Sequence, residues 1–458
     1  MGTAQHVDAQ AARLLLERHA ELQELVSSRA SDLGIPGVAV GVTLRGAEDI
    51  VYHGVTTPDG GDEIGPTTRF PLGSTDKTFT ATLIMRLVEQ GRVDISAPVR
   101  RYLPELRLRD PAVAEQVTVL HLLNHTSGWA GDFAPDTGDS DDHLARFVER
   151  LVDAEQEAPL GARVSYSNSA FSVAMRVVEK VTRLPYRHAL QQILLDPLGL
   201  VEHDFATTEN VPQPFALGHV REGHNLRCIG LDDVAGGIAA TARDQLRYAR
   251  FHLGDGSGLL RPETLAQMRA RTTPDGDSAQ TLAFGIGWML RDLAGVQVIG
   301  HGGSNSGHQS ALELVPERGF ALVGLTNARH GLELLTDLKD WAFETYLGLA
   351  PPPPEFIVLT PDELAAYTGE YVSHTGIVHV AADEDVLVAT LTLNPEMLAE
   401  AGELETTQPE PPLPFRLLAD DRFLVTSGQY KGLRGAFLRD LSGEIDGIDL
   451  GRVFTRRR

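Results

Sequence analysis

The sequence predicts an α/β (α+β) fold in which an antiparallel sheet is flanked by helices and interrupted by a helical insert, with a small antiparallel β-barrel at the C-terminal end. β-Prone segments occur at residues 37–55 and again at 283–327, and the region between them is mainly helical in pattern. Four consecutive prolines, Pro351 to Pro354, then end this pattern, and short β-prone segments follow them. The sheet must therefore pair strands that are distant in sequence, with helices on its faces.

The first part of the chain begins with apolar residues at helical spacing over residues 8–31, which predicts an amphipathic helix. The β-prone stretches 37–44 and 49–55 are separated by turn residues, which predicts a hairpin. A second helix is expected from Thr78 onward, and Gly91 stands where that helix would end.

The later part of the sheet is predicted from β-prone stretches at 283–288, 296–299, 310–315 and 320–325. The last two are joined by the turn residues 316–319, which predicts a second hairpin. Three regions follow from these patterns: a large first domain over residues 1–349, a proline-rich linker over 350–356, and a barrel domain over 357–458.

The composition excludes several classes of function. The formal charge of -23 over 458 residues argues against a nucleic-acid surface, which needs clustered Lys and Arg. No stretch approaches the roughly 18 apolar residues of a membrane span. The first residues have neither a basic start nor an apolar core, so no secretory signal is expected and a cytoplasmic location is predicted. Cys228 is the only cysteine, which excludes an internal disulfide and a zinc–thiolate site.

Ser74 and Lys77 form an S-x-x-K motif at the start of the second predicted helix. On a helix the two side chains lie on one face, so an amine stands beside a hydroxyl. A desolvated lysine can activate a serine as a nucleophile. For such a short motif alone, a helix-capping serine and a solvated lysine are the more frequent arrangement. The nucleophile hypothesis therefore requires partner residues.

Tyr166 and Asn168 are candidate partners, in a loop that enters the predicted helix 170–181. A neighbouring ammonium group favours the phenolate, so Tyr166 could carry the proton of the serine. Asn168 could hold a substrate amide or orient the lysine. The alternative is a buried tyrosine whose hydroxyl is hydrogen-bonded within the core.

A third candidate is His301-Gly302-Gly303-Ser304, which is expected directly after the strand 296–299. Two glycines would let a substrate backbone approach an edge strand, and backbone N–H groups there could stabilise an oxyanion. A simple turn is the alternative. A phosphate-binding loop is excluded because the motif lacks a Walker lysine and a following helix.

His121 and His125 stand four residues apart, a spacing that can hold zinc on one helix face. Neither an intervening glutamate nor a third ligand is evident, so we expect no metal and no other cofactor. The acidic stretch 132–142 contains Pro135 and Gly138, which predicts a loop, solvated or covering a cleft.

The ordered set Ser-x-x-Lys, Tyr-x-Asn and His-Gly-Gly resembles the serine β-lactamase and penicillin-binding-protein-like family, in particular its class C, D-aminopeptidase and esterase branch. The stretches 122–128 and 235–244 also look similar to that family. The resemblance covers roughly residues 10–348, and it implies a β-lactamase-like transpeptidase fold. The residues past the prolines look like the lipocalin-like C-terminal domain of some members.

The resemblance implies a role for each motif position. Ser74 would be the acylated nucleophile, Lys77 its activating partner, and Tyr166 the group that passes protons to the leaving group and activates the acceptor. The substrate-binding residues would be Asn168, His301, Gly302 and Gly303, and the oxyanion hole would use the backbone N–H groups of Ser74 and Ser304.

His301 departs from the family pattern, because many members carry a lysine there that recognises a carboxylate. A histidine, with an ordinary pKa of about 6.5, is mostly neutral at pH 7. Strong carboxylate recognition is therefore not expected. The Tyr-x-Asn motif also differs from the Ser-Asp-Asn of class A enzymes.

The motifs together predict a serine hydrolase or acyltransferase (esterase, D-peptidase or peptide cyclase). Its substrate would be an amide, ester or thioester of a peptide-like molecule, next to a D-configured residue. An alternative is a stand-alone thioesterase of the penicillin-binding-protein type, which releases and macrocyclises nonribosomal peptides held as carrier-bound peptidyl thioesters. A non-catalytic sensor on the same fold would be expected to lack the serine, lysine or tyrosine, and all three are present.

Overall fold

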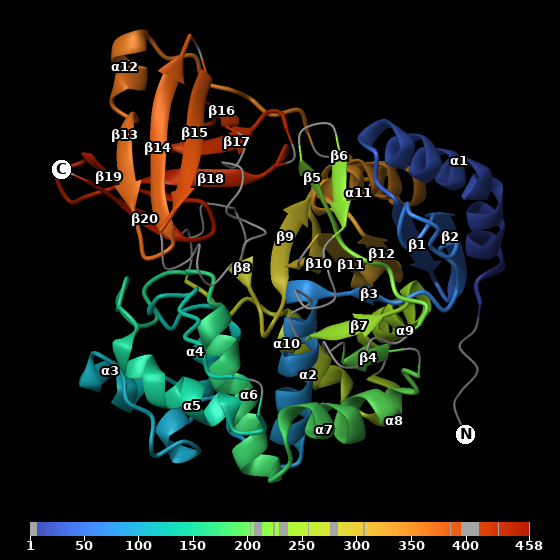
Figure 1. Ribbon diagram of the computed structural model, residues 1–458, viewed down its shortest axis with the longest axis horizontal. Helices are drawn as coiled ribbons and strands as arrows, with labels where there is room; N and C mark the ends of the chain where they lie inside the picture. The colour runs from blue at the N-terminus through green and yellow to red at the C-terminus, as the bar shows by residue number, and fades with distance from the viewer. Residues whose placement is uncertain are drawn as a thin grey trace. The chain divides into compact units, whose positions relative to one another are not determined.

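The computed structural model (Figure 1) describes residues 7–138, 140–201, 203–205, 213–222, 225–228, 237–254, 256–274, 283–305, 307–350, 352–384, 386–394, 412–428 and 430–457. The chain forms two compact units. The sheet unit contains Met1–Glu89, Leu190–Arg269 and Trp288–Pro352, and the helix–barrel unit contains Gln90–Ala189, Ala270–Gly287 and Pro353–Arg458. The predicted stretch 235–244 is described only from Gly237 onward.

The sheet unit is built on antiparallel strands in the order β2-β1-β12-β11-β10-β9. Strands β1 and β12 are therefore adjacent although they stand at opposite ends of the unit's sequence, as the sequence predicted. The bounds are β1 (Gly37–Leu44), β2 (Ala47–Gly54), β9 (Met289–Leu293), β10 (Val296–Asn305), β11 (His308–Val315) and β12 (Phe320–Thr326). Both predicted hairpins, β1–β2 and β11–β12, are confirmed.

Helices pack on both faces of this sheet. Alternate residues of β1 (Val38, Val40 and Val42) share a buried cluster with α1 (Ala9–Leu33) and α11 (Leu332–Leu347). The opposite face of β1 packs on α9 (Ala242–Leu253), where a Cβ on Gly41 would lie 2.7 Å from a methyl carbon of Leu246. Every residue of β1, β11 and β12 is buried because the strands are covered on both sides.

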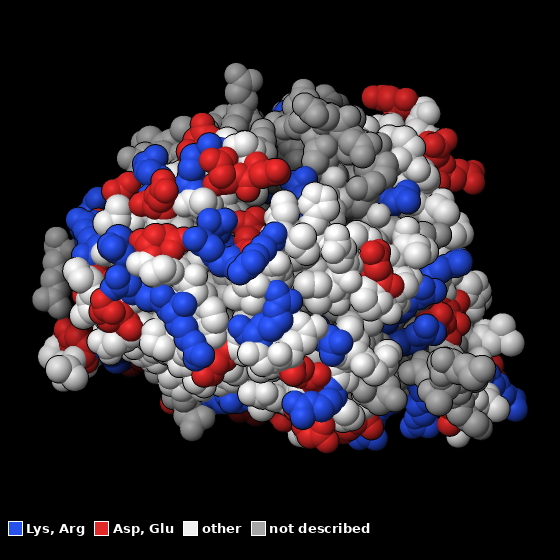
Figure 2. Space-filling view, turned by 90° about the horizontal axis from the view of Figure 1, so that it is seen from below, with Lys and Arg blue, Asp and Glu red and all other residues white. Residues whose placement is uncertain are grey.

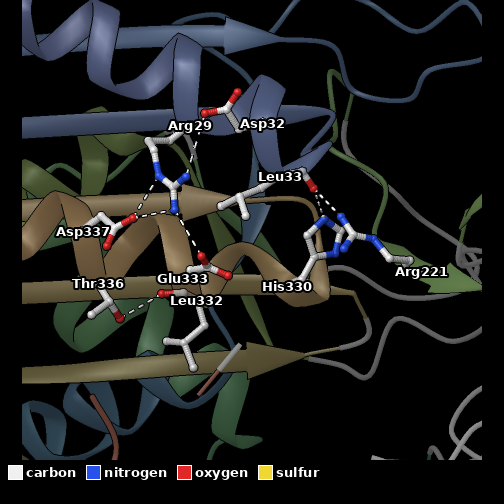
Figure 3. A network of polar contacts seen from close by, with 9 residues as sticks. All are labelled: Arg29, Asp32, Leu33, Arg221, His330, Leu332, Glu333, Thr336 and Asp337. Atoms are coloured by element: carbon white, nitrogen blue, oxygen red, sulfur yellow. Dashed lines mark hydrogen bonds and ion pairs between the residues drawn. The ribbon is translucent and has the colours of Figure 1, made fainter. Parts of the chain in front are cut away.

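Polar contacts join α1 to α11 at one end of the unit (Figure 3). The guanidinium of Arg29 lies 3.1 Å from the carboxylate of Glu333 and 2.7 Å from that of Asp337. The last turn of α1 is held at the carbonyl oxygen of Leu33, which accepts hydrogen bonds from His330 Nε2 at 2.9 Å and from Arg221 at 2.5 Å.

The shorter elements of the sheet unit surround the main sheet. They are the strands β3 (Phe70–Pro71), β7 (Ile238–Ala240) and β4 (His203–Phe205), the pair β5 (His219–Glu222) and β6 (Asn225–Cys228), and the helices α2 (Asp76–Glu89), α8 (Asp196–Leu198) and α10 (Pro262–Arg269). Helix α7 (Tyr186–Leu190) spans the boundary between the units.

The helix–barrel unit combines the helical insert with the C-terminal barrel. Its elements are α3 (Pro111–Gln116), α4 (Val119–Leu123), α5 (His143–Arg150), α6 (Asn168–Thr182), β8 (Ala283–Phe284) and α12 (Pro361–Ala365), followed by the barrel strands β13 (Gly369–Val372), β14 (Gly376–Asp383), β15 (Val386–Leu393), β16 (Leu413–Leu417), β17 (Arg422–Val425), β18 (Arg434–Arg439), β19 (Ile445–Asp449) and β20 (Val453–Arg456). The barrel is closed and antiparallel, as predicted.

The interior of the barrel is filled by side chains. The rings of Phe415 and Phe423 have centroids 4.4 Å apart, and Phe437 lies 5.5 Å from Phe423. Tyr371, Val378 and the other members of the cluster complete this core. A barrel of eight strands has an interior about wide enough for such side chains.

On the face shown in Figure 2, acidic and basic side chains are interspersed. Among the described residues, no helix has the length and apolar character needed to cross a membrane.

Candidate active site

Ser74 and Lys77 are brought together by a short turn at the start of α2. Gly73–Thr75 form a 3₁₀ turn that leads directly into the helix at Asp76. The Nζ atom of Lys77 donates a hydrogen bond to Ser74 Oγ at 3.1 Å. The lysine is only 7% exposed. It is therefore a buried amine held against a hydroxyl, and the interpretation as a solvated lysine is wrong.

Polar contacts of Thr75 hold the turn that contains Ser74 against β10 and β11. Thr75 Oγ1 donates to the carbonyl oxygen of His301 at 3.3 Å and lies 2.8 Å from Ser310 Oγ. Gly73 has a φ of +52°, and a Cβ there would lie 2.7 Å from the carbonyl oxygen of Ser304. A glycine is needed at this close approach. The backbone segments that contain Ser74 and Ser304 therefore lie side by side.

The His-Gly-Gly motif lies inside β10, and the prediction that it follows the strand is wrong. Pairing with β11 continues from His301 through Asn305, whereas pairing with β9 ends at Gly300. The two glycines have different surroundings. A Cβ on Gly303 would lie 1.9 Å from the carbonyl oxygen of Leu72, whereas the nearest atom to a Cβ on Gly302 would be 3.7 Å away.

The imidazole of His301 is 2% exposed. Burial, with a smaller contribution from the charge of Lys77, lowers the pKa of His301 to about 3, although a hydrogen bond to the backbone of Gly302 opposes this. The ring is therefore neutral at pH 7, which confirms the expectation from the sequence. A neutral imidazole offers a substrate carboxylate no compensating charge.

Tyr166 and Asn168 lie in the helix–barrel unit, at the start of α6. The N–H groups of Asn168 and Ser169 both donate to the carbonyl oxygen of Gly131 at 2.9 Å. A Cβ on Gly131 would lie 2.1 Å from the carbonyl oxygen of Tyr166, so this approach requires glycine. The ring of Tyr166 stacks on His125, with centroids 4.2 Å apart.

The histidines considered as zinc ligands have other partners. The N–H group of Thr118 donates to His121 Nδ1 at 3.1 Å, in a capping box at the start of α4. The N–H group of Ser167 donates to His125 Nδ1 at 3.0 Å, which fixes the tautomer and supports the Tyr166 segment. The described residues contain no cluster of three potential metal ligands.

Sequence reasoning missed two charged residues beside the Tyr-x-Asn motif. Asp132 belongs to the acidic stretch interpreted as a loop, but its side chain is only 10% exposed and accepts a hydrogen bond from Asn168 Nδ2 at 2.9 Å. Arg452, in the connection from β19 to β20, pairs with the same carboxylate. No local pattern links these two residues, which stand far apart in the chain.

The predicted site residues thus fall into two groups. Ser74, Lys77, His301, Gly302, Gly303 and Ser304 belong to the sheet unit, whereas Tyr166 and Asn168 belong to the helix–barrel unit. Within each group the residues lie on neighbouring segments held by backbone contacts.

Comparison with known proteins agrees with the family that the sequence resembles. The family described as Beta-lactamase matches residues 22–347. A relative named penicillin-binding protein 4, from Amycolatopsis lactamdurans, is 34% identical over 70% of this chain and 88% of its own length. A β-lactamase from Lysobacter lactamgenus is 30% identical over 51% of this chain and 60% of its own.

Solved structures resemble the chain over nearly its whole length. The crystal structure of SurE has a TM-score of 0.75 at 25% identity and covers 97% of this chain and 100% of its own. The octameric penicillin-binding protein homologue from Pyrococcus abyssi has a TM-score of 0.65 at 20% identity, covers 96% of this chain and 98% of its own, and shares the fold.

Proposed function

The chain belongs to the Beta-lactamase family, and we propose that it is a serine hydrolase or acyltransferase that forms an acyl-enzyme on Ser74. The observation that carries this proposal is the 3.1 Å hydrogen bond between Lys77 Nζ and Ser74 Oγ, with the lysine 7% exposed. A serine becomes a strong nucleophile when a nearby base accepts its proton.

The proposed reaction has two steps. Ser74 Oγ attacks the carbonyl carbon of an amide, ester or thioester while its proton passes to the proposed base, Lys77 or Tyr166. Tyr166 then protonates the leaving group as its bond to the carbonyl carbon breaks. In the second step, water or an amine attacks the carbonyl carbon of the acyl-enzyme, and the proton that it loses is transferred to Ser74 Oγ as the bond between Ser74 Oγ and the acyl group breaks.

The oxyanion in both steps would be held by the backbone N–H groups of Ser74 and Ser304. The close approach of Gly73 to Ser304 supports this assignment. Asn168, His301, Gly302 and Gly303 would bind the substrate. The open space around a Cβ on Gly302 supports a substrate backbone along this part of β10.

The substrate class follows from the charge at position 301. A neutral His301 favours a peptide-like amide, ester or thioester over a β-lactam recognised by its carboxylate. We propose a D-configured residue beside the scissile bond. One solved structure that resembles this chain, with a TM-score of 0.71, contains SurE with D-Leu, which supports a site of this stereochemistry.

A second candidate is a stand-alone thioesterase that releases and cyclises a nonribosomal peptide from a carrier. The closed barrel that follows the family region supports this candidate, because the resemblance noted in the sequence includes members with such a C-terminal domain. Cyclisation would use the same acyl-enzyme but an amine of the bound peptide as acceptor, in a site that excludes water.

The test of the acyl-enzyme is intact-mass spectrometry after exposure to an activated ester. The wild type should gain a stoichiometric adduct that peptide mapping places on Ser74, and Ser74→Ala should gain none. Survival of the adduct in Ser74→Ala would overturn the proposal. Cys228→Ser is the matched control, since the exposed thiol of Cys228 is another nucleophile that an activated ester could label.

Product analysis then distinguishes the two candidates. The substrates are a p-nitrophenyl ester, a D-alanyl amide and a linear peptidyl thioester with a free N-terminal amine. A hydrolysed acid supports the hydrolase, and a cyclic peptide supports the thioesterase.

A further inference from the structure

The C-terminal barrel contacts the segment that contains Tyr166 and Asn168, within the helix–barrel unit. The N–H group of Tyr166 donates to the carbonyl oxygen of Gly451 at 3.0 Å. The guanidinium carbon of Arg452 lies 5.4 Å from the centre of the Tyr166 ring, within the range of a cation–π contact. The connection between β19 and β20 is therefore in contact with both the backbone and the ring of this tyrosine.

Arg452 also holds the carboxylate of Asp132. Its Nη2 atom donates to Asp132 Oδ1 at 2.6 Å, and its Nε atom pairs with Oδ2. Thr375, between β13 and β14, donates to Oδ2 at 3.3 Å. Two connections of the barrel thus meet at one carboxylate, and the planar guanidinium sets its orientation.

Asp132 in turn orients the amide of Asn168. A carboxylate only accepts hydrogen bonds, so the group that faces it at 2.9 Å must be the NH₂ group of Asn168. The amide oxygen is then directed away from Asp132, where it can accept from a donor. Without Asp132, the side-chain amide of Asn168 could rotate, and its oxygen and its NH₂ group could exchange positions.

The ion pair between Asp132 and Arg452 is partly shielded from water, so solvent screens the attraction between the two charges only in part. The side chain of Asp132 is 10% exposed and that of Arg452 is 32% exposed. Burial alone would lower the pKa of Arg452, but the charge and hydrogen bond of Asp132 outweigh it and raise that pKa. The guanidinium therefore stays charged beside Tyr166, and removing either partner leaves a shielded charge without its counterion.

We propose that Arg452 and Asp132 are positioning residues, through which the barrel fixes the Asn168 amide and the Tyr166 ring in the geometry that catalysis requires. This inference rests on the proposed function, because it assigns to the barrel the alignment of two residues of that reaction. The barrel is then part of the catalytic apparatus.

The test is a double-mutant cycle with Asp132→Asn and Arg452→Gln in the full-length chain. Each single variant should lower kcat/KM on the D-alanyl amide by about 10- to 100-fold, the loss typical of a misplaced reacting group. Because both act on the same two residues, the double variant should lose no more than the worse single variant. Arg452→Lys should recover part of the loss, because it keeps the charge but not the two-point contact.

Arg439→Gln is the matched control. Arg439 also pairs with an aspartate, Asp421, at 2.7 Å, but this pair lies elsewhere on the barrel. Its removal should lower the melting temperature about as much as Arg452→Gln does, yet leave kcat/KM unchanged. Equal kcat/KM for Arg452→Gln and Arg439→Gln, or independent effects of Asp132 and Arg452, would overturn the proposal.

Labelling by the activated ester separates this inference from the proposed function. If Ser74 of the wild type is not labelled, the proposed function fails. If Ser74 is labelled in the wild type and in Arg452→Gln, and the two proteins turn over the amide equally, the function stands and the positioning role is refuted.

Discussion

The protonation of His301 can be tested by substituting this residue and measuring stability at two pH values. The imidazole is 2% exposed, and its pKa is lowered from 6.5 to about 3. Between these two values the unfolded chain binds a proton that the folded chain does not. The stabilising contribution of a neutral His301 is therefore complete above pH 6.5 and is lost as the pH falls from there towards 3.

The magnitude follows from these two pKa values. Each pH unit between them costs about 1.4 kcal/mol of stability. At pH 7 the imidazole is mostly neutral in both states, and at pH 4.5 the unfolded form is fully protonated. The wild type should thus lose about 2–3 kcal/mol between pH 7 and pH 4.5 through His301 alone.

The assay is urea unfolding at pH 7 and pH 4.5, followed by the fluorescence of tryptophan, since Trp288 is fully buried in the sheet unit. In His301→Gln the loss between the two pH values should be smaller than in the wild type by about 2–3 kcal/mol. His301→Asn, which is also uncharged, should behave like His301→Gln. Equal losses in all three proteins would show that His301 titrates normally, and the argument against a carboxylate site would fail.

Two further predictions concern the motifs. Lys77→Ala and Tyr166→Phe should each lower kcat on a p-nitrophenyl ester by about 100-fold or more, the usual contribution of a positioned proton-transfer group; near-normal turnover in steady-state assays would remove that residue from the mechanism. Gly303→Ala should destabilise the fold by about 1–3 kcal/mol in thermal unfolding, because its Cβ would lie 1.9 Å from a carbonyl oxygen. Gly302→Ala has room for a methyl group, so a comparable loss of stability in that variant would contradict this explanation.

The elements that the sequence predicted are those with a strong local pattern. The amphipathic period of α1 and the turn residues of both hairpins are short-range signals, and all three elements form where expected. The extension of β10 through His301 was missed because two glycines resemble a turn. The extended conformation is imposed by pairing with β11, which is a contact between strands that no local pattern records.

The same distinction applies to the candidate site. Ser74 and Lys77 stand three residues apart, so their spacing predicts that they share one helix face, and the structure shows the contact that the motif alone left open. The pairing of Asp132 with Arg452 joins a loop of the helical insert to the last connection of the barrel. In an acidic stretch, an aspartate that will be buried is indistinguishable from its solvated neighbours. Only the folded chain shows which carboxylate has a counterion.

The identity of residue 301 connects the buried lysine to the choice of substrate. Lys77 is a buried amine, and its charge contributes to the low pKa of His301. A lysine at position 301 would place a second cation in the same poorly solvated region, where like charges repel more strongly than in water. A carboxylate on the substrate could offset such a charge. With a neutral His301 no such anion is needed, and the arrangement is better suited to a substrate that is uncharged at this position.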